Sequence, residues 1–165
     1  MATPTTLPAT FVSGSVLTAS ELNNLRGAFR VLQIVQSSTS TAATTSAGTY
    51  VTTGLTGTIT PSNSSSQVLV IVSAPMGTGS GISTFATVFR GTVSGTNLGG
   101  GSDNALAELY SAAAGTTLSH VGITVLDSPS TTSAQTYTLG YKSSNGTFIA
   151  VSRSKATMTL MEISA

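Results

Sequence analysis

The chain contains no cysteine, no tryptophan and few charged residues. Without cysteine there is no disulfide framework, and with one histidine a zinc site within a single chain is excluded. The absence of tryptophan argues against a sugar-binding site built on a flat aromatic platform. Charged residues make up 7% of the chain, against about 25% in an ordinary domain, and the net charge is +1. Binding of nucleic acid or of a membrane surface through clustered positive charge is therefore not expected.

Long hydrophobic runs are missing as well. The longest, Val68 to Val72, is far shorter than the roughly 20 residues that cross a bilayer. The opening MATPTTLPAT has neither the basic start nor the apolar stretch of a secretory signal. Serine and threonine instead supply about a third of the chain. A surface of hydroxyl groups with so little charge favours association, so we expect a protein that works within an assembly or outside a cell.

Residues 1–27 are predicted to form an anchoring arm followed by one short helix. The start of the chain is rich in proline and threonine, which is typical of an extended arm. Thr18 and Glu21 are spaced as a capping box, and Gly27 is a natural stop. A helix of about two turns is marginal alone in water, so it needs a surface to lie against. The apolar residues predicted to dock on a partner are Leu17, Leu22 and Leu25.

Residues 28–165 are predicted to form an all-β domain. The short β-branched and aromatic stretches recur every 8–15 residues and predict about eight to ten strands. That pattern is typical of an antiparallel β-sandwich of the jelly-roll type. The stretch 49–60 is expected as one or two strands, broken at Gly54 and Gly57. The other predicted strands are 28–36, 67–74, 83–89, 105–113, 117–127, 135–143, 147–153 and 157–164, with Asn145-Gly146 as a hairpin turn.

Period-two alternation predicts which side chains share a face of each strand. In the strand over 67–74, every residue from Val68 to Val72 is apolar. A strand that is apolar on both faces is typical of the centre of a sheet. The sets expected to face one way are Phe85, Thr87 and Phe89; Val121, Ile123 and Val125; and Tyr137, Leu139 and Tyr141.

Two glycine-rich segments, 77–81 and 91–104, are predicted as loops. Loops on a rigid sandwich often carry recognition, which makes them candidates for binding a glycan or a host-cell surface. The alternative is that they are loose, solvent-exposed connections. The candidate recognition residues are Gly77, Gly79, Gly99, Asp103 and Asn104.

No pattern in the chain predicts catalysis, a cofactor or a metal site. His120 lies an odd number of positions from Asp127, so on a continuous strand the two face opposite ways and cannot form a catalytic pair. Asp103 stands almost alone, whereas calcium needs several convergent carboxylates. The stretch GTGSGIS lacks the lysine and spacing of a phosphate-binding loop. We therefore expect a protein that is not an enzyme.

Several fragments resemble a diffuse family of phage virion proteins, common in marine and freshwater phages. They follow in the same order and at similar spacing over about residues 31–165, and the ITPS and LDSP pieces are the most specific. The resemblance implies a virion-surface β-sandwich, and no functional residue is carried over. The chain departs from the pattern at Gln67, where relatives have lysine or arginine. The matching pieces are VLQIVQ, ITPSNSSSQVLVIV, FRG, LDSPSTTSAQTY and TMTLMEI.

The sequence thus favours a non-enzymatic bacteriophage structural protein on the particle exterior, held to a capsid or tail component by residues 1–27. A capsid decoration (cement) protein is preferred, because the chain has no coiled coil or repeat to build a fibre shaft. The alternative is a short tail fibre, a tail adaptor or a receptor-binding module. A homotrimer is expected, since the low charge and apolar strands suit burial at a symmetric interface.

Overall fold

The computed structural model describes Gly14, Val16 and residues 31–144, 149–151 and 154–164. The predicted helix, with Leu17, Leu22 and Leu25, lies outside the described residues, and so does the Asn145-Gly146 turn. The strands of the described part are β1 (Val31–Thr39), β2 (Ala43–Thr45), β3 (Val51–Ile59), β4 (Gln67–Thr78), β5 (Ile82–Arg90), β6 (Thr96–Asn97), β7 (Ala107–Ser111), β8 (Thr117–Asp127), β9 (Gln135–Ser143), β10 (Ile149–Val151) and β11 (Ala156–Ile163).

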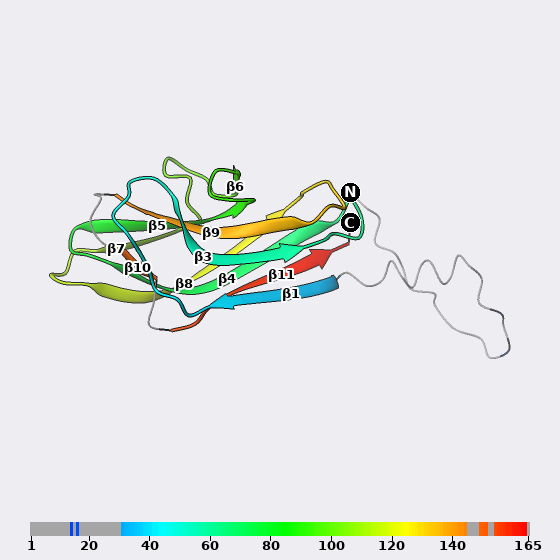
Figure 1. Cartoon of the computed structure of the whole chain (residues 1–165), viewed down its shortest axis with the longest axis horizontal. Helices are drawn as coiled ribbons and strands as arrows, with labels where there is room; N and C mark the ends of the chain where they lie inside the picture. Colours follow the sequence, from blue (N-terminus) through cyan, green and yellow to red (C-terminus); the bar gives the residue numbers. More distant parts are fainter. Residues whose placement is uncertain (1–13, 15, 17–30, 145–148, 152–153, 165) are drawn as a thin grey trace.

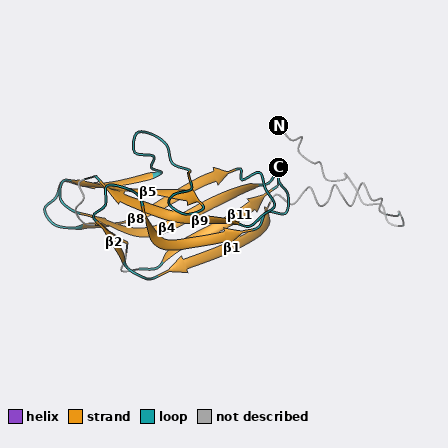
Figure 2. Cartoon of the chain, turned by 45° about the horizontal axis from the view of Figure 1, so that its top comes forward, coloured by secondary structure: helices purple, strands orange, loops and turns teal. Residues whose placement is uncertain are grey.

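The strands form two stacked antiparallel sheets, which confirms the predicted all-β antiparallel sandwich (Figures 1 and 2). The four-stranded sheet has the order β1-β11-β4-β8. The five-stranded sheet has the order β3-β9-β5-β6, and β7 also pairs with β5. A small ladder joins β10 to β2. The chain crosses from one sheet to the other between β3 and β4 and again between β4 and β5. It also crosses between β8 and β9, and between β9 and β11.

The core lies between the two sheets, where alternate residues of the long strands point inward. In the four-stranded sheet, Val70 of β4 stands between Leu160 of β11 and Val125 of β8. The five-stranded sheet contributes Tyr137, Leu139 and Tyr141, at most 1% exposed, so their predicted common face is confirmed. The set Val121, Ile123 and Val125 also faces inward, as predicted. Burying a side chain of this size contributes roughly 1.5–3 kcal/mol to the free energy of folding.

The predicted interruption of the strand over 49–60 is wrong, because β3 runs unbroken through both glycines. Gly54 has a positive φ of 81°, and the register of β3 on β9 shifts between Thr52 and Thr56. The irregular backbone is therefore absorbed as a bulge inside the strand. Gly57 faces the core, where a Cβ would come within 3.1 Å of the Leu160 side chain. Here glycine makes room for packing and does not end the strand.

The predicted loop over 77–81 is also wrong in its first two residues. Gly77 and Thr78 belong to β4, because the long ladder with β8 continues to the pair Thr78–Thr117. Only residues 79–81 turn the chain into β5. The hydroxyl-rich segment after β1 contains the short strand β2. The stretch 105–113, predicted as a strand, contains β7.

Candidate functional site

The outer face of the five-stranded sheet is covered by residues 91–106, which we call the loop cap. Phe85, Thr87 and Phe89 point to this outer side, which confirms that they share a face. They are nevertheless buried, with exposures of 8%, 0% and 4%. Figure 1 shows the loop cap, with β6, crossing above β5. The glycine-rich segment is therefore part of the packed structure and not a loose connection.

Backbone hydrogen bonds hold the second half of the loop cap to β5 at two points. Leu98 N donates to the Val88 carbonyl at 2.9 Å, and Leu106 N donates to the Ala86 carbonyl at 2.9 Å. Between them, Gly100 and Ala105 bond reciprocally, which closes a tight hairpin. The chain that returns from this hairpin continues directly into β7 on the edge of β5.

Asn97 organises the inside of the loop cap. Its Oδ1 accepts hydrogen bonds from Thr87 Oγ1 at 2.8 Å and from Gly99 N at 2.7 Å. Its Nδ2 donates to the Asn104 carbonyl at 3.0 Å. A Cβ at Gly99 would lie 2.4 Å from the Asn104 carbonyl oxygen and 2.6 Å from Thr87 Oγ1, so no larger residue fits there without rearrangement. Asn104 itself has a positive φ of 50°, a conformation that asparagine tolerates better than most residues.

Asp103 lies at the tip of this hairpin and is held from two directions. Lys142 of β9 forms an ion pair with its carboxylate, with Nζ to Oδ1 at 3.0 Å. The Tyr50 hydroxyl donates to the carbonyls of Asp103 and Asn104, at 2.9 Å and 3.1 Å. Burial and the nearby Asp103 charge raise the pKa of Tyr50 to about 12, so its hydroxyl remains a donor across the physiological range.

Aromatic rings surround the Lys142 ammonium group. Its Nζ lies 5.1 Å from the ring centres of both Tyr50 and Phe85, within the range of a cation–π contact. The Tyr50 ring in turn meets Phe89 edge-on, with centroids 5.4 Å apart. Lys142 therefore connects the loop cap to the aromatic side chains beneath it.

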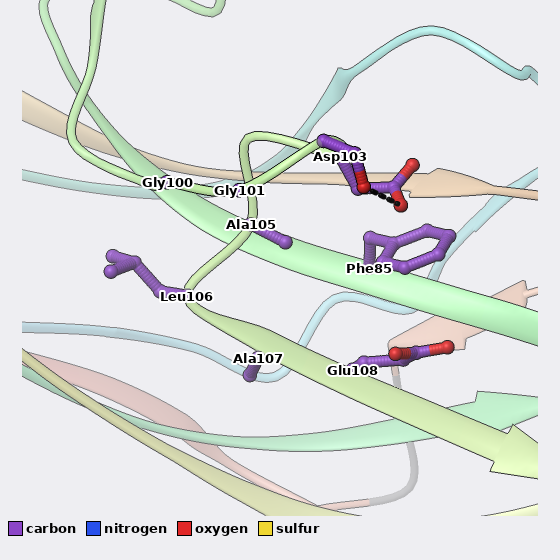
Figure 3. A pocket seen from close by; sticks show the side chains of 9 residues that line it. Phe85, Gly100, Gly101, Asp103, Ala105, Leu106, Ala107 and Glu108 are labelled. Carbon is purple, nitrogen blue, oxygen red and sulfur yellow. Dashed lines mark hydrogen bonds between the residues drawn. The ribbon is translucent and has the colours of Figure 1, made fainter.

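Two open hollows flank Asp103. The first, of about 310 Å³, is lined by Phe85, by residues 100–103 and by residues 105–108, which lead from the hairpin into β7. Figure 3 shows the Phe85 ring between the side chains of Asp103 and Glu108. The second, of about 360 Å³, lies on the other side of Asp103 and includes Tyr50, Asn97 and Lys142. Both offer hydrogen-bonding groups around an aromatic surface, which suits shallow recognition of a polar ligand.

The structure brings together only some of the predicted recognition residues. Gly99, Asp103 and Asn104 lie in the same hairpin, over the middle of β5. Gly77 lies within β4, and Gly79 lies in the turn that precedes β5. The two glycine segments therefore do not form one recognition surface at β5. The predicted docking residues Leu17, Leu22 and Leu25 are not among the described residues.

Sequence reasoning did not identify Tyr50, Asn97 and Lys142 as parts of this site. Alternation on β9 does place Lys142 on the face opposite to Tyr141, and hence outward. Its partner, however, lies 39 positions away, and the partners of Tyr50 lie 53 and 54 positions away. No local pattern signals contacts at such separations.

His120 and Asp127 lie on opposite faces of β8, as predicted. His120 is exposed on the outer face, where its Nε2 lies 2.7 Å from Ser73 Oγ. Asp127 faces inward and accepts hydrogen bonds from Arg90 and from the Tyr137 hydroxyl. Among the described residues there is no group of three or more potential metal-ligating acids and histidines. In the same part of the chain, no helix has the length and apolar character to span a membrane.

The fold defines the class of this molecule as an all-β, antiparallel two-sheet sandwich. No protein-family model matches the chain, and no curated protein is similar to it in sequence. Among solved structures it is similar to a VP2 subviral particle of infectious bursal disease virus, with 12% identity and a TM-score of 0.46. It is also similar to the Gx strain of that virus, with 15% identity and a TM-score of 0.44. In both cases the match covers 81% of this chain and 37% of the other.

Proposed function

We propose that this protein is a bacteriophage virion structural protein, a non-enzymatic β-sandwich that decorates the capsid exterior. The observation that carries the proposal is the strand order. The sheet β1-β11-β4-β8 faces the sheet β3-β9-β5-β7, and the first long strand lies beside the last. This order supports our proposal that the sandwich is a jelly roll. Double-sheet jelly rolls are found in viral capsid proteins, in lectins and in cupins. The fragments that resemble phage virion proteins favour the first of these three.

The described residues support a structural role in two further ways. Polar contacts of the core, such as those of Arg90 and Tyr137 with Asp127, join one strand to another. His120 is the chain's one histidine and is placed on the outer face, away from Asp127. We therefore propose a rigid body without a reaction centre, which needs no cofactor.

We further propose that residues 1–27 attach the sandwich to a major capsid protein or a tail component. An assembly that carries several such arms would gain effective concentration, which turns weak contacts into a durable attachment. Deletion of residues 1–27 is expected to leave a folded sandwich that no longer joins particles. Loss of the fold would contradict this division of roles.

Protein stoichiometry in purified virions tests the proposal. A decoration protein is expected in hundreds of copies per particle, and its absence from particles would overturn the virion role. A few tens of copies or fewer would instead indicate the alternative, a short tail fibre or tail adaptor.

The hollows beside Asp103 favour one second candidate, a receptor-binding module for a glycan or another host-surface group. Asp103, Asn104 and Tyr50 surround an open aromatic surface there, and loops on a sandwich commonly carry recognition. A glycan array or a host-cell pull-down with the purified protein tests this role. Loss of binding in Asp103→Ala would support the receptor-binding role, provided that Ser64→Ala retains binding. Ser64 is the control because it lies in the exposed turn between β3 and β4.

A further inference from the structure

The two sheets differ in what covers their outer faces. The loop cap covers the five-stranded sheet, whereas six exposed large apolar side chains lie on the strands of the four-stranded sheet. Among the described residues, only two other large apolar side chains are exposed, those of Val16 and Tyr110. Soluble monomers rarely expose apolar side chains in such a concentration. The six are Val31, Leu32, Ile34, Ile71, Leu118 and Leu126.

Strand register aligns part of this surface into a continuous row. Ile34 of β1 lies opposite Met161 of β11, which lies opposite Leu69 of β4, and Leu69 lies opposite Leu126 of β8. The row thus crosses all four strands, and we call it the apolar row. Its two ends are the most open, with Ile34 60% and Leu126 50% exposed. Ile71 and Ile163 lie next to it on the same face.

This outer face carries almost no charge. Its other outward positions are Gln, Ser, Thr, Gly or Pro, and His120 is the one ionisable side chain among them. A surface that faces water usually alternates charged residues with polar ones. Contact with a strongly charged partner would leave that partner's charges desolvated and unpaired. A second copy of this chain offers a surface that matches, because the same uncharged face meets no like charge.

The size of the face also suits a second copy. Four strands about 4.8 Å apart, over about nine residues each, give a flat area of roughly 600 Å². Two copies would then bury roughly 1,200 Å² in total, which reaches the lower end of stable protein–protein interfaces. Stacked sheets in general pack about 10 Å apart through interdigitated apolar side chains. The two sheets of this sandwich enclose an apolar core of the same kind.

We propose that the apolar row is the self-association surface of this protein, covered by a second copy of the same chain. This inference rests on the proposed assembly role and specifies the face through which copies meet. The assembly role and the self-association surface can be contradicted by different experiments. Absence from virions would contradict the assembly role, whereas the association state is measured on the purified full chain alone.

Analytical ultracentrifugation of the full chain at micromolar concentration tests the inference. The wild type is expected to form an oligomer, and Ile34→Asp and Leu126→Asp are each expected to weaken its association at least tenfold. Tyr110→Asp is the matched control, because Tyr110 is 59% exposed but lies on β7 of the other sheet. It should leave association unchanged. Thermal melting of each variant verifies that the fold is retained, since all three positions are exposed.

The absence of cysteine provides an independent readout. Thr124→Cys, on the outer face of β8, is expected to form disulfide-linked copies under mild oxidation, whereas Thr58→Cys on β3 is not. A wild type that stays monomeric at about 100 µM would overturn the inference, because its Kd for self-association would then be weaker than roughly that concentration. So would an oligomer that neither Asp substitution weakens. If residues 1–30 of the same chain cover the row, the wild type is monomeric and Thr124→Cys resists thiol reagents, which also overturns it.

Discussion

Gln33 and Glu162 lie 129 positions apart in the chain, yet Gln33 Nε2 donates a 2.6 Å hydrogen bond to the Glu162 carboxylate. The other carboxylate oxygen accepts from both N and Oγ of Ser62, each at 2.7 Å. Glu162 is completely buried. Burial alone would raise its pKa, but these hydrogen bonds outweigh that effect and lower the pKa to about 2. One buried carboxylate therefore joins β1, β11 and the turn that follows β3.

Glu162→Gln is expected to destabilise the protein by about 2 kcal/mol at neutral pH, because it removes a charge that the fold stabilises. The folded pKa of Glu162, about 2, is below its ordinary value of 4.5. Its contribution is therefore complete above about pH 4.5 and is lost as the pH falls toward 2. Urea unfolding of both proteins between pH 7 and pH 2 should show the difference shrinking over that range. Glu108→Gln, on the edge strand β7, is the control and should show little effect. If the difference in unfolding free energy between the wild type and Glu162→Gln does not change with pH, the lowered pKa of Glu162 is contradicted.

Gly140→Ala is expected to cost about 1–3 kcal/mol of stability, because overpacking forces neighbours out of position. A Cβ at Gly140 would lie 2.6 Å from the Phe89 ring. Gly122→Ala is the matched control, since a Cβ there meets nothing within 4 Å. Thermal melts of the two variants should therefore differ, with only Gly140→Ala lowering the Tm. Equal melting temperatures would mean that Phe89 does not pack on β9 as described.

Asp127→Ala is expected to lower stability by about 2 kcal/mol, or roughly 4–8 °C in Tm. The change leaves two donors without their acceptor, namely Arg90 Nη1 at 3.1 Å and the Tyr137 hydroxyl at 2.8 Å. Arg90 is partly open to solvent, which limits the loss. Asp103→Ala, at the more exposed ion pair with Lys142, should cost less. The reverse ranking in calorimetry would contradict the burial described for Asp127.

Tyr50→Phe is expected to loosen the loop cap without unfolding the sandwich, because it removes the hydroxyl that bonds to Asp103 and Asn104. Hydrogen exchange of the backbone amides over 99–106 should accelerate several-fold, while those of β4 stay protected. Tyr110→Phe, at an exposed hydroxyl elsewhere, serves as the control. Unchanged exchange in Tyr50→Phe would show that the loop cap is held by its backbone contacts alone.

Alternation along single strands was sufficient to predict much of the fold. It gave the inward face of Tyr137, Leu139 and Tyr141 because each strand buries one side, and period two follows directly from strand geometry. Strand limits were harder to predict. Gly54 and Gly77 carry the same local signal as a break, but pairing with β9 and β8 continues past both. Tertiary hydrogen bonds overrode the local preference of glycine.

The candidate site was predictable only in part, because its contacts are not local. Glycine content marked the segment around Gly99 and Asp103 as unusual, although it suggested looseness where the structure has a packed cap. The outward position of Phe85 followed from alternation, but nothing in the sequence indicated that residues 91–106 would fold back over it. Contacts such as Tyr50 to Asp103 depend on the finished sheet, which brings β3 beside β9.

The pairing of Val31 with Ile163 has a practical consequence for engineering. The chain enters the sandwich at Val31 of β1 and leaves it at Ile163 of β11, and these two strands are adjacent. The two points therefore lie within about 5 Å of each other at one corner of the molecule. Such a body can be spliced into a surface loop of an unrelated carrier without stretching that carrier's backbone. Peptides grafted at the far end, for example in the 79–81 turn, would then stand away from the point of insertion.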